Sequence, residues 1–219
     1  MLLGGLDPAT LISRAIILII AFTVHELAHA VTADYFGDDT PRINGRLTLN
    51  PLAHLDPMGS LLLLVAGFGW ARPVPVNPYA LSRRSPAALM LVSLAGPLSN
   101  FGLAILAAIP IRLGLVSLAG AFTASRGILP TPGMFLIEFM WINLVLMLFN
   151  LLPIAPLDGD KIAEYFFPPA WARVLQNIRP YGPIILISLL FIGPFVFRTN
   201  IIFSIIGPPL QALMRILVG

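Results

Sequence analysis

The sequence contains no cysteine and few charged residues. Its 219 residues include 13 Lys and Arg and 10 Asp and Glu, which together make 11% of the chain. Because cysteine is absent, disulfide bonds and thiolate metal ligands are excluded, while the redox compartment stays open. A soluble domain carries about 25% charged residues, so this composition excludes an ordinary water-soluble enzyme. The net charge of +3 fits basic loops at a membrane surface and predicts no nucleic-acid partner.

Most of the chain consists of apolar residues. They make 58% of the chain, and the mean hydropathy is +0.91. Long apolar runs predict an integral protein of the lipid bilayer, with residues 1–219 forming a single membrane-embedded domain. The first apolar helix starts near Pro8 without a basic n-region or a small-residue cleavage site, so we expect a retained span and not a signal peptide.

The first apolar run contains the motif His25-Glu26-Leu27-Ala28-His29. In a helix, positions i and i+4 share one face, so both imidazoles can reach one metal ion. Glu26 lies next to the first histidine, beside the ion. This is the His-Glu-x-x-His pattern of zinc hydrolases, in which two ligands and a carboxylate act on the metal-bound water.

The hydropathy pattern predicts an all-α polytopic protein, a helical bundle of five to six spans. We expect a core at 8–165 with spans at about 8–36, 87–112 and 134–152, and additional membrane segments within 181–218. Asn44-Gly45 is the dipeptide that most favours a type I′ turn, which predicts a small membrane-associated β-hairpin at about 40–50. Residues 58–70 are apolar but short and glycine-rich, which indicates a re-entrant segment.

Basic residues predict the orientation. If residues 58–70 re-enter, the loops 37–86 and 153–180 share one face and hold most of the basic side chains. These are Arg42, Arg46, Arg72, Arg83, Arg84, Lys161, Arg173 and Arg179, against Arg112, Arg126 and Arg198 on the other face. The positive-inside rule then places the N-terminus outside and the metal site nearer the cytoplasmic face.

A catalytic zinc site needs a third protein ligand and an open position for water. The ionisable candidates outside the motif are His54, Asp56, Glu138, Asp158, Asp160 and Glu164. Asp158 is favoured because two prolines break the helix before it and Gly159 follows, and such a break can turn a carboxylate into the bundle. An Asp-Gly surface turn is the alternative explanation.

Three separated motifs together resemble the site-2 protease family of intramembrane zinc metalloproteases. They are His25-Glu26-x-x-His29, Gly96-Pro97-x-x-Asn100 and Asn150-x-x-Pro153-x-x-Pro156-Leu157-Asp158-Gly159, in the family's order. The likeness covers about residues 21–161, and the segments 46–57 and 73–78 are similar to the short bacterial and archaeal members. The loops are too short for the PDZ or CBS domain of many relatives.

The resemblance implies one Zn²⁺ per chain, held by His25, His29 and Asp158. It implies that Glu26 is the catalytic base and that Asn150 positions the substrate or stabilises the oxyanion. The expected partner is a membrane protein with a transmembrane segment, and the expected location is a prokaryotic cell membrane. The family's membrane-associated β-hairpin matches residues 40–50.

A helical substrate must unwind before its peptide bonds can be attacked. We hypothesise that residues Arg46, Leu47, Thr48 and Leu49 form an edge strand that holds the substrate extended by β-addition. Asn100 is a candidate for substrate binding, with an equally weighted structural role in tying helices together.

Two other functions stay open at this point. A catalytically silent scaffold or transporter could keep a structural metal, although a closed structural site has no need of Glu26. A transporter is also expected to contain repeated halves, and we find no sequence repeat. A membrane zinc hydrolase that acts on a non-peptide bond is disfavoured only by the family resemblance.

Overall fold

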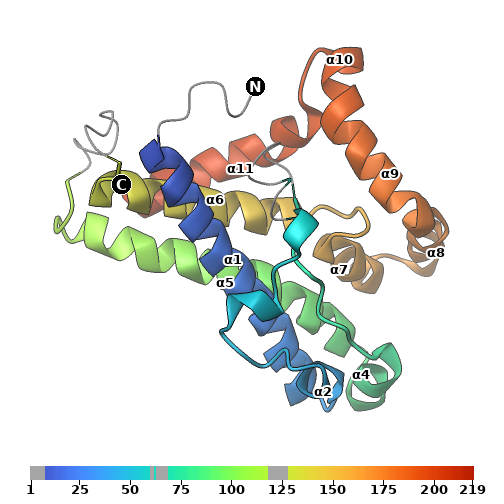
Figure 1. The fold of residues 1–219 in the computed structure, drawn as a ribbon. Coiled ribbons are helices and arrows are strands. Elements are labelled where there is room, and N and C mark those ends of the chain that lie inside the picture. Colours follow the sequence, from blue (N-terminus) through green and yellow to red (C-terminus); the bar gives the residue numbers. More distant parts are fainter. Residues whose placement is uncertain (1–7, 60–61, 63–68, 118–127) are drawn as a thin grey trace.

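The computed structural model describes residues 8–59, 62, 69–117 and 128–219, and all regular structure in these ranges is helical (Figure 1). The helices are α1 (Pro8–Tyr35), α2 (Thr40–Ile43), η1 (Pro51–Ala53), α4 (Pro78–Arg84), α5 (Ala88–Arg112), α6 (Pro132–Asn150), α7 (Asp158–Phe166), α8 (Pro169–Ile178), η3 (Arg179–Tyr181), α9 (Gly182–Ile187), the π-helical turn η4 (Ser188–Ile192), α10 (Gly193–Phe197) and α11 (Ile201–Val218).

Helix α5 lies at the centre of the bundle, with α1 and α6 packed against it (Figure 1). One core cluster joins the three helices, and it includes Ile17 of α1, Ala108 of α5 and Met140 of α6. Small residues on α5, such as the fully buried Ala104, allow the backbones to approach closely. The three helices occupy the positions predicted for the core spans.

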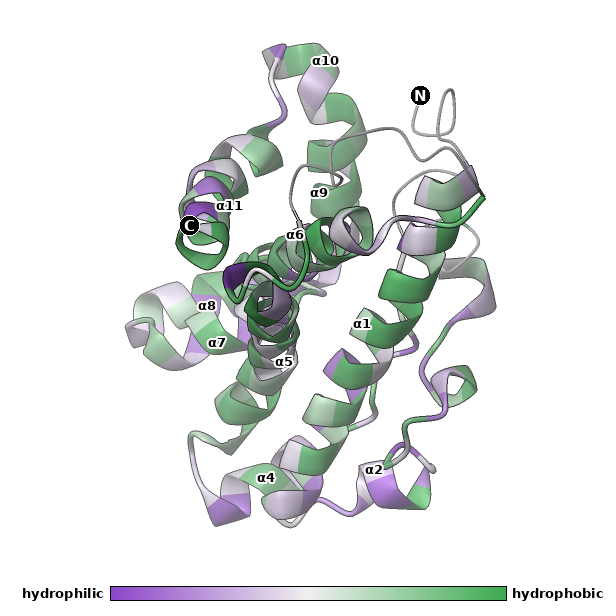
Figure 2. Cartoon of the chain, turned by 90° about the vertical axis from the view of Figure 1, so that its left-hand side faces the viewer, coloured by the Kyte–Doolittle hydropathy of each residue, from purple (hydrophilic) through white to green (hydrophobic). Residues whose placement is uncertain are grey.

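Five helices in the described ranges are long and apolar enough to cross a membrane. Their ranges are Pro8–Tyr35, Ala88–Arg112, Pro132–Asn150, Pro169–Val196 and Ile201–Val218, where Pro169–Val196 runs continuously from α8 into α10. Figure 2 shows apolar residues along the bundle helices and polar residues gathered at α2 and the loops beside it. This arrangement agrees with the predicted multi-span helical bundle.

Helix α11 runs parallel to α5 and antiparallel to α6. Its first half packs near the end of α6, where Ile202 and Ile206 join a cluster with Leu152. Its last turn lies at the end of α5, where the Arg112 guanidinium donates to the carbonyls of Ile216 and Leu217. Arg215 therefore lies at the same end of the bundle as Arg112.

The predicted β-hairpin at residues 40–50 is wrong. Thr40–Ile43 form the short helix α2, with Pro41 in its first turn. Gly45 follows with φ +66°, and the Arg46 amide donates to the Pro41 carbonyl, so Asn44-Gly45 ends a helix. A positive-φ glycine suits both a helix C-terminus and a type I′ turn, and this is why the dipeptide misled the prediction.

The edge strand proposed at Arg46–Leu49 loses its basis with the hairpin. Arg46 is buried, and its Nη1 donates to the carbonyls of Ala53 and Arg72 at 2.5 and 3.1 Å. The carbonyl of Thr48 contacts His54 Nε2 at 2.8 Å. These contacts hold the loop against the bundle without a strand in the described ranges. The re-entrant segment expected at 58–70 lies mostly outside the described residues.

Candidate metal centre

His25 and His29 lie one turn apart on the buried face of α1. The two residues are 6% and 8% exposed, so both are buried within the bundle. The two imidazole rings meet edge to face, with 4.6 Å between centroids. This is the arrangement that the i, i+4 spacing predicts for two ligands of one ion.

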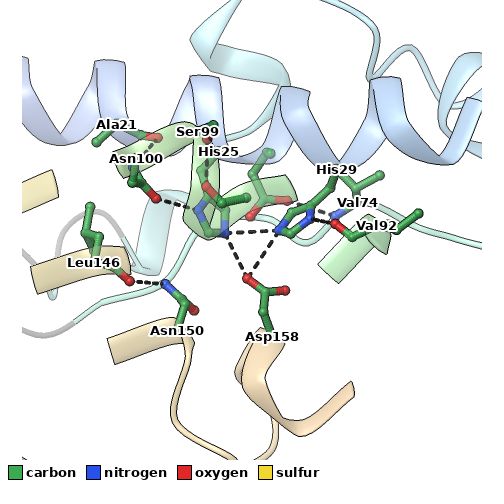
Figure 3. A network of polar contacts seen from close by, with 12 residues as sticks. Ala21, His25, His29, Val74, Val92, Ser99, Asn100, Leu146, Asn150 and Asp158 are labelled. Atoms are coloured by element: carbon green, nitrogen blue, oxygen red, sulfur yellow. Dashed lines mark hydrogen bonds and ion pairs between the residues drawn. The ribbon is translucent and has the colours of Figure 1, made fainter. Parts of the chain in front are cut away.

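Asp158 completes a three-ligand cluster with the histidines (Figure 3). Its Oδ2 lies 3.2 Å from His25 Nε2 and 3.4 Å from His29 Nε2, and the two Nε2 atoms are 3.0 Å apart. Ligand atoms at about 2.0–2.1 Å from a tetrahedral zinc are separated by about 3.3 Å. The three atoms therefore have the spacing of a zinc coordination shell with one position left open.

The hydrogen bonds of the other ring nitrogens support this fit. His29 Nδ1 lies 2.7 Å from the Val92 carbonyl, which can only accept, so Nδ1 carries the proton. His25 Nδ1 lies 2.6 Å from Asn100 Oδ1 in the same way. Both Nε2 lone pairs then face the Asp158 carboxylate oxygen, which has no other partner in the described ranges. Three electron-rich atoms that point at one another form a donor set suited to a bound metal cation.

The break between α6 and α7 positions Asp158 beside the two histidines. Helix α6 ends at Asn150, and α7 begins at Asp158 after a segment that contains two prolines. A Cβ on Gly159 would lie 2.3 Å from the Leu152 carbonyl oxygen, so α7 folds back tightly onto the end of α6. Only glycine permits this close approach, which turns the first residue of α7 toward α1.

Gly96 allows α5 to pass directly beneath both imidazoles. A Cβ at this position would lie 2.4 Å from His29 Nε2 and 2.6 Å from His25 Cε1. Pro97, which has no N–H, follows it and removes the helical hydrogen bond to the carbonyl four residues earlier, that of Ser93. The Gly-Pro pair therefore shapes α5 around the metal centre.

We expect the substitution Gly96→Ala to displace the imidazoles and lower zinc affinity by about tenfold or more, comparable to the loss of a second-shell partner. The measurement is a zinc titration of the purified protein against a competing chelator. Gly102→Ala on the same helix is the control, because its Cβ would meet no atom within 4 Å. Equal zinc affinities of the two variants would contradict the proposed close approach.

Asn100 lies behind His25 and is fully buried. Its Nδ2 donates to the Ala21 carbonyl at 3.4 Å (Figure 3) and to Asn143 Oδ1 at 3.0 Å, so the amide is fixed in orientation. Asn100 thus orients an imidazole within the three-helix core. These contacts give it a structural role between α1, α5 and α6.

Replacing Asn100 with leucine is expected to reduce zinc affinity by about 10–100-fold, because the partner of His25 Nδ1 is lost. Asn143→Leu breaks the bond to Asn100 but leaves the bond to His25, so its effect on zinc should be smaller. Both variants should lose thermal stability, and zinc affinity is therefore the measurement that separates them. Similar zinc affinities for the two variants would count against this role of Asn100.

Glu26 is buried beside the cluster, and a backbone amide holds it. The Val74 N–H donates to Glu26 Oε2 at 3.0 Å, and the Val74 segment comes from the loop before α4 (Figure 3). The buried carboxylate of Asp38 anchors this loop, since its Oδ2 accepts from the Asn77 amide at 2.6 Å. One carboxylate oxygen of Glu26 is thereby held by this loop.

Asn150 is the last residue of α6 and lies on the Asp158 side of the cluster (Figure 3). Its Nδ2 donates to the Leu146 carbonyl of its own helix at 3.0 Å. The amide therefore contacts neither histidine and would have to release Leu146 to reach a substrate.

The other candidate ligands have partners elsewhere. Glu138 pairs with Arg14 at 3.2 Å, Asp160 with Arg179 at 2.7 Å, and Asp56 accepts from the Gly59 amide. His54 is buried against the Thr48 carbonyl.

Glu164 also contributes to the contact between α7 and α8. Partial burial alone would raise the pKa of Glu164, but hydrogen bonds from Gln176 and Arg179 hold it below its usual value. The carboxylate is therefore ionised and committed to α8 and η3, away from the histidines.

Sequence reasoning missed the backbone groups of the site. The Val92 carbonyl and the Val74 amide fix His29 and Glu26, yet every residue carries such groups and no sequence signal distinguishes them.

A cluster of two histidines and one aspartate, with a glutamate beside it, defines a zinc hydrolase centre within a bundle that contains membrane-length helices. The model of peptidase family M50 matches residues 112–193. The chain is 46% identical to "Putative zinc metalloprotease YwhC" of Bacillus subtilis over 190 residues, 85% of this chain and 84% of that protein. The chain belongs to peptidase family M50.

A second relative extends the comparison. The chain is 33% identical to "Putative zinc metalloprotease Rip2" of Mycolicibacterium smegmatis over 178 residues, which is 78% of this chain and 64% of that protein. No solved structure matches the chain. The family and the relatives confirm the predicted site-2 protease resemblance, so the protein is a multi-pass membrane zinc metalloprotease.

Proposed function

We propose that the protein is an intramembrane endopeptidase that cleaves the transmembrane segments of other membrane proteins. The position of the His25, His29 and Asp158 cluster carries the proposal. His25 and His29 lie about 15 and 9 Å from the C-terminal end of α1 at 1.5 Å per residue, so the cluster lies below the end of a membrane-length helix. Ionisable groups are rare at such depth without a functional role.

His25, His29 and Asp158 hold the metal in this proposal. Zinc, when bound, acts as a Lewis acid toward water and the substrate carbonyl. Glu26 takes the proton of the attacking water at its free oxygen and passes it to the leaving amine. The Val74 amide donates to the other oxygen, and this bond restricts the orientation of the carboxylate, which supports the proposed role.

Asn150 is proposed to stabilise the oxyanion. Its amide lies at the end of α6 on the Asp158 side and can rotate from the Leu146 carbonyl toward a bound substrate. A donor well aimed at a developing oxyanion is worth about 2.7–4 kcal/mol. The single domain of residues 1–219 would place all these groups in one bundle.

We further propose that the metal site faces the cytoplasm of a prokaryotic cell. Arg83 and Arg84 end α4 on the loop side of the site, and the basic residues of loops 37–86 and 153–180 outnumber those of the other face. The chain has no cysteine, so Ser82→Cys offers one exposed thiol in this region. In intact cells an impermeant maleimide should fail to label it, and labelling without permeabilisation would reverse the orientation.

The test of the function is cleavage in a membrane. The purified full chain is reconstituted in liposomes with a panel of single-span proteins, and mass spectrometry locates the cut. We expect a cut within the apolar span that stops with chelator and returns with added zinc. Matched soluble proteins that lack the span are the control.

Cutting only outside the span, or cutting that persists after zinc removal, would contradict the proposal. A scaffold or transporter with a structural metal would cut nothing in any arm while retaining zinc.

A further inference from the structure

A groove of about 430 Å³ runs along the exposed side of α11, with Trp141 of α6 as its other wall. Phe203, Gly207 and Gln211 are spaced four residues apart on α11, so the groove follows one helix face. Gly207 leaves an open space in the groove, the hollow, because a Cβ at this position would meet no atom within 4 Å. Both helices have membrane-spanning length, so the groove opens toward lipid.

Two polar side chains lie in this apolar groove, Gln211 and Arg215, one helical turn apart. Both are exposed, and neither side chain has a hydrogen bond or ion pair in the part of the chain that the structure describes. Arg215 can extend its guanidinium to the membrane surface from the last turn of α11. Gln211 is too short and lies about 10 Å from the helix end, so its amide needs a partner inside the bilayer.

Among the described residues, Arg215 has no acidic partner at its end of the bundle. Arg112 lies at the same end and binds the last carbonyls of α11. Glu138 lies in the first half of α6 and is paired with Arg14 at 3.2 Å. A ligand in the groove is therefore expected to carry a negative charge.

We propose that this groove binds an anionic phospholipid. The phosphate binds the Arg215 guanidinium, Gln211 Nε2 donates to the ester carbonyl one turn deeper, and an acyl chain lies over Gly207 beside Trp141 and Phe203. The order of these groups along α11, from charge to amide to apolar hollow, is the order of phosphate, ester and acyl chain in a glycerophospholipid. A second copy packed in parallel through this face would bring two Arg215 charges together, which disfavours a dimer here.

The experiment measures lipid binding by native mass spectrometry of the full chain in non-ionic detergent. The probes are phosphatidylglycerol and phosphatidylcholine with identical acyl chains. We expect wild-type protein to bind phosphatidylglycerol about tenfold more tightly, because the quaternary ammonium of phosphatidylcholine offsets the charge of its phosphate beside Arg215 and phosphatidylglycerol has no such group. Arg215→Gln should abolish that preference, while Arg83→Gln, an exposed arginine in the last turn of α4, should keep it.

Filling the hollow tests the acyl part of the site. Gly207→Leu should lower the affinity for both lipids, whereas Gly102→Leu places the same side chain on an open position of α5 and should change neither. An unchanged lipid preference in Arg215→Gln, or unchanged binding in Gly207→Leu, would overturn the proposal. A change from dimer to monomer in Gly207→Leu would also overturn it, because the groove would then be a self-association face. Zinc content should be unchanged in every variant, because none of these residues belongs to the metal centre, so the result is independent of the protease mechanism.

Discussion

Replacing Glu26 with glutamine is expected to abolish proteolysis while the protein keeps its zinc and its fold. A general base contributes about 10²–10⁴ to the rate, so the variant should fall by that factor with any membrane substrate. Glutamine has the same shape, and its Oε1 can still accept from the Val74 amide that now holds Glu26 at 3.0 Å. The loss should therefore come from the missing base and not from a displaced loop.

Turnover, zinc content and unfolding temperature are measured on the same preparation. Asp39→Asn is the matched control, since this carboxylate is exposed and makes no capping bond at α2. It should cleave at the wild-type rate. Near-normal cleavage by Glu26→Gln would remove Glu26 from the mechanism, and loss of zinc in that variant would give it a structural role instead.

Replacing Asp158 with asparagine is expected to lower zinc affinity by more than about a hundredfold, the upper end of the effect of a lost second-shell group. The carboxylate oxygen lies within 3.4 Å of both Nε2 atoms and provides the negative charge of the cluster. Asparagine keeps the shape but supplies a neutral ligand. The fold should survive, because Gly159 and the break after α6 remain.

Asp160→Asn is the control that distinguishes the loss of a zinc ligand from the loss of a structural contact in the same helix. Asp160 is 3% exposed and pairs with Arg179 at 2.7 Å and with Lys161 at 3.1 Å. Its substitution should lower the unfolding temperature and leave zinc affinity within a few-fold of wild type. If Asp158→Asn keeps full zinc affinity, or if only Asp160→Asn loses it, the proposed ligand set is wrong.

The main features of the fold could be predicted from the sequence. Apolar runs of membrane-spanning length have few structural solutions, because every backbone polar group must find a partner within the bilayer. This constraint is why α1, α5 and α6 lie where the hydropathy pattern expects them. The i, i+4 histidines and the proline-broken segment before Asp158 are similarly restrictive, and the structure brings those three side chains together.

Other features depend on long-range contacts that the sequence does not encode locally. A glycine at position 45 can adopt a positive φ either in a hairpin or at a helix end. In the structure Gly45 follows the end of a helix, and Arg46 is buried with its guanidinium bonded to the Ala53 and Arg72 carbonyls. The motif contains Gly96, but only the structure shows its physical role, which is to make room for imidazoles about 70 positions earlier in the chain. Local propensity could not distinguish these cases.

The central claim is that two imidazoles and one distant carboxylate hold a zinc ion within the bundle of membrane-length helices. X-ray absorption at the zinc edge of the purified wild-type protein tests it most directly. We predict one zinc per chain, nitrogen and oxygen neighbours at about 2.0–2.2 Å, and outer-shell scattering from two imidazoles. A preparation without zinc, or a spectrum with fewer than two imidazoles, would contradict the account.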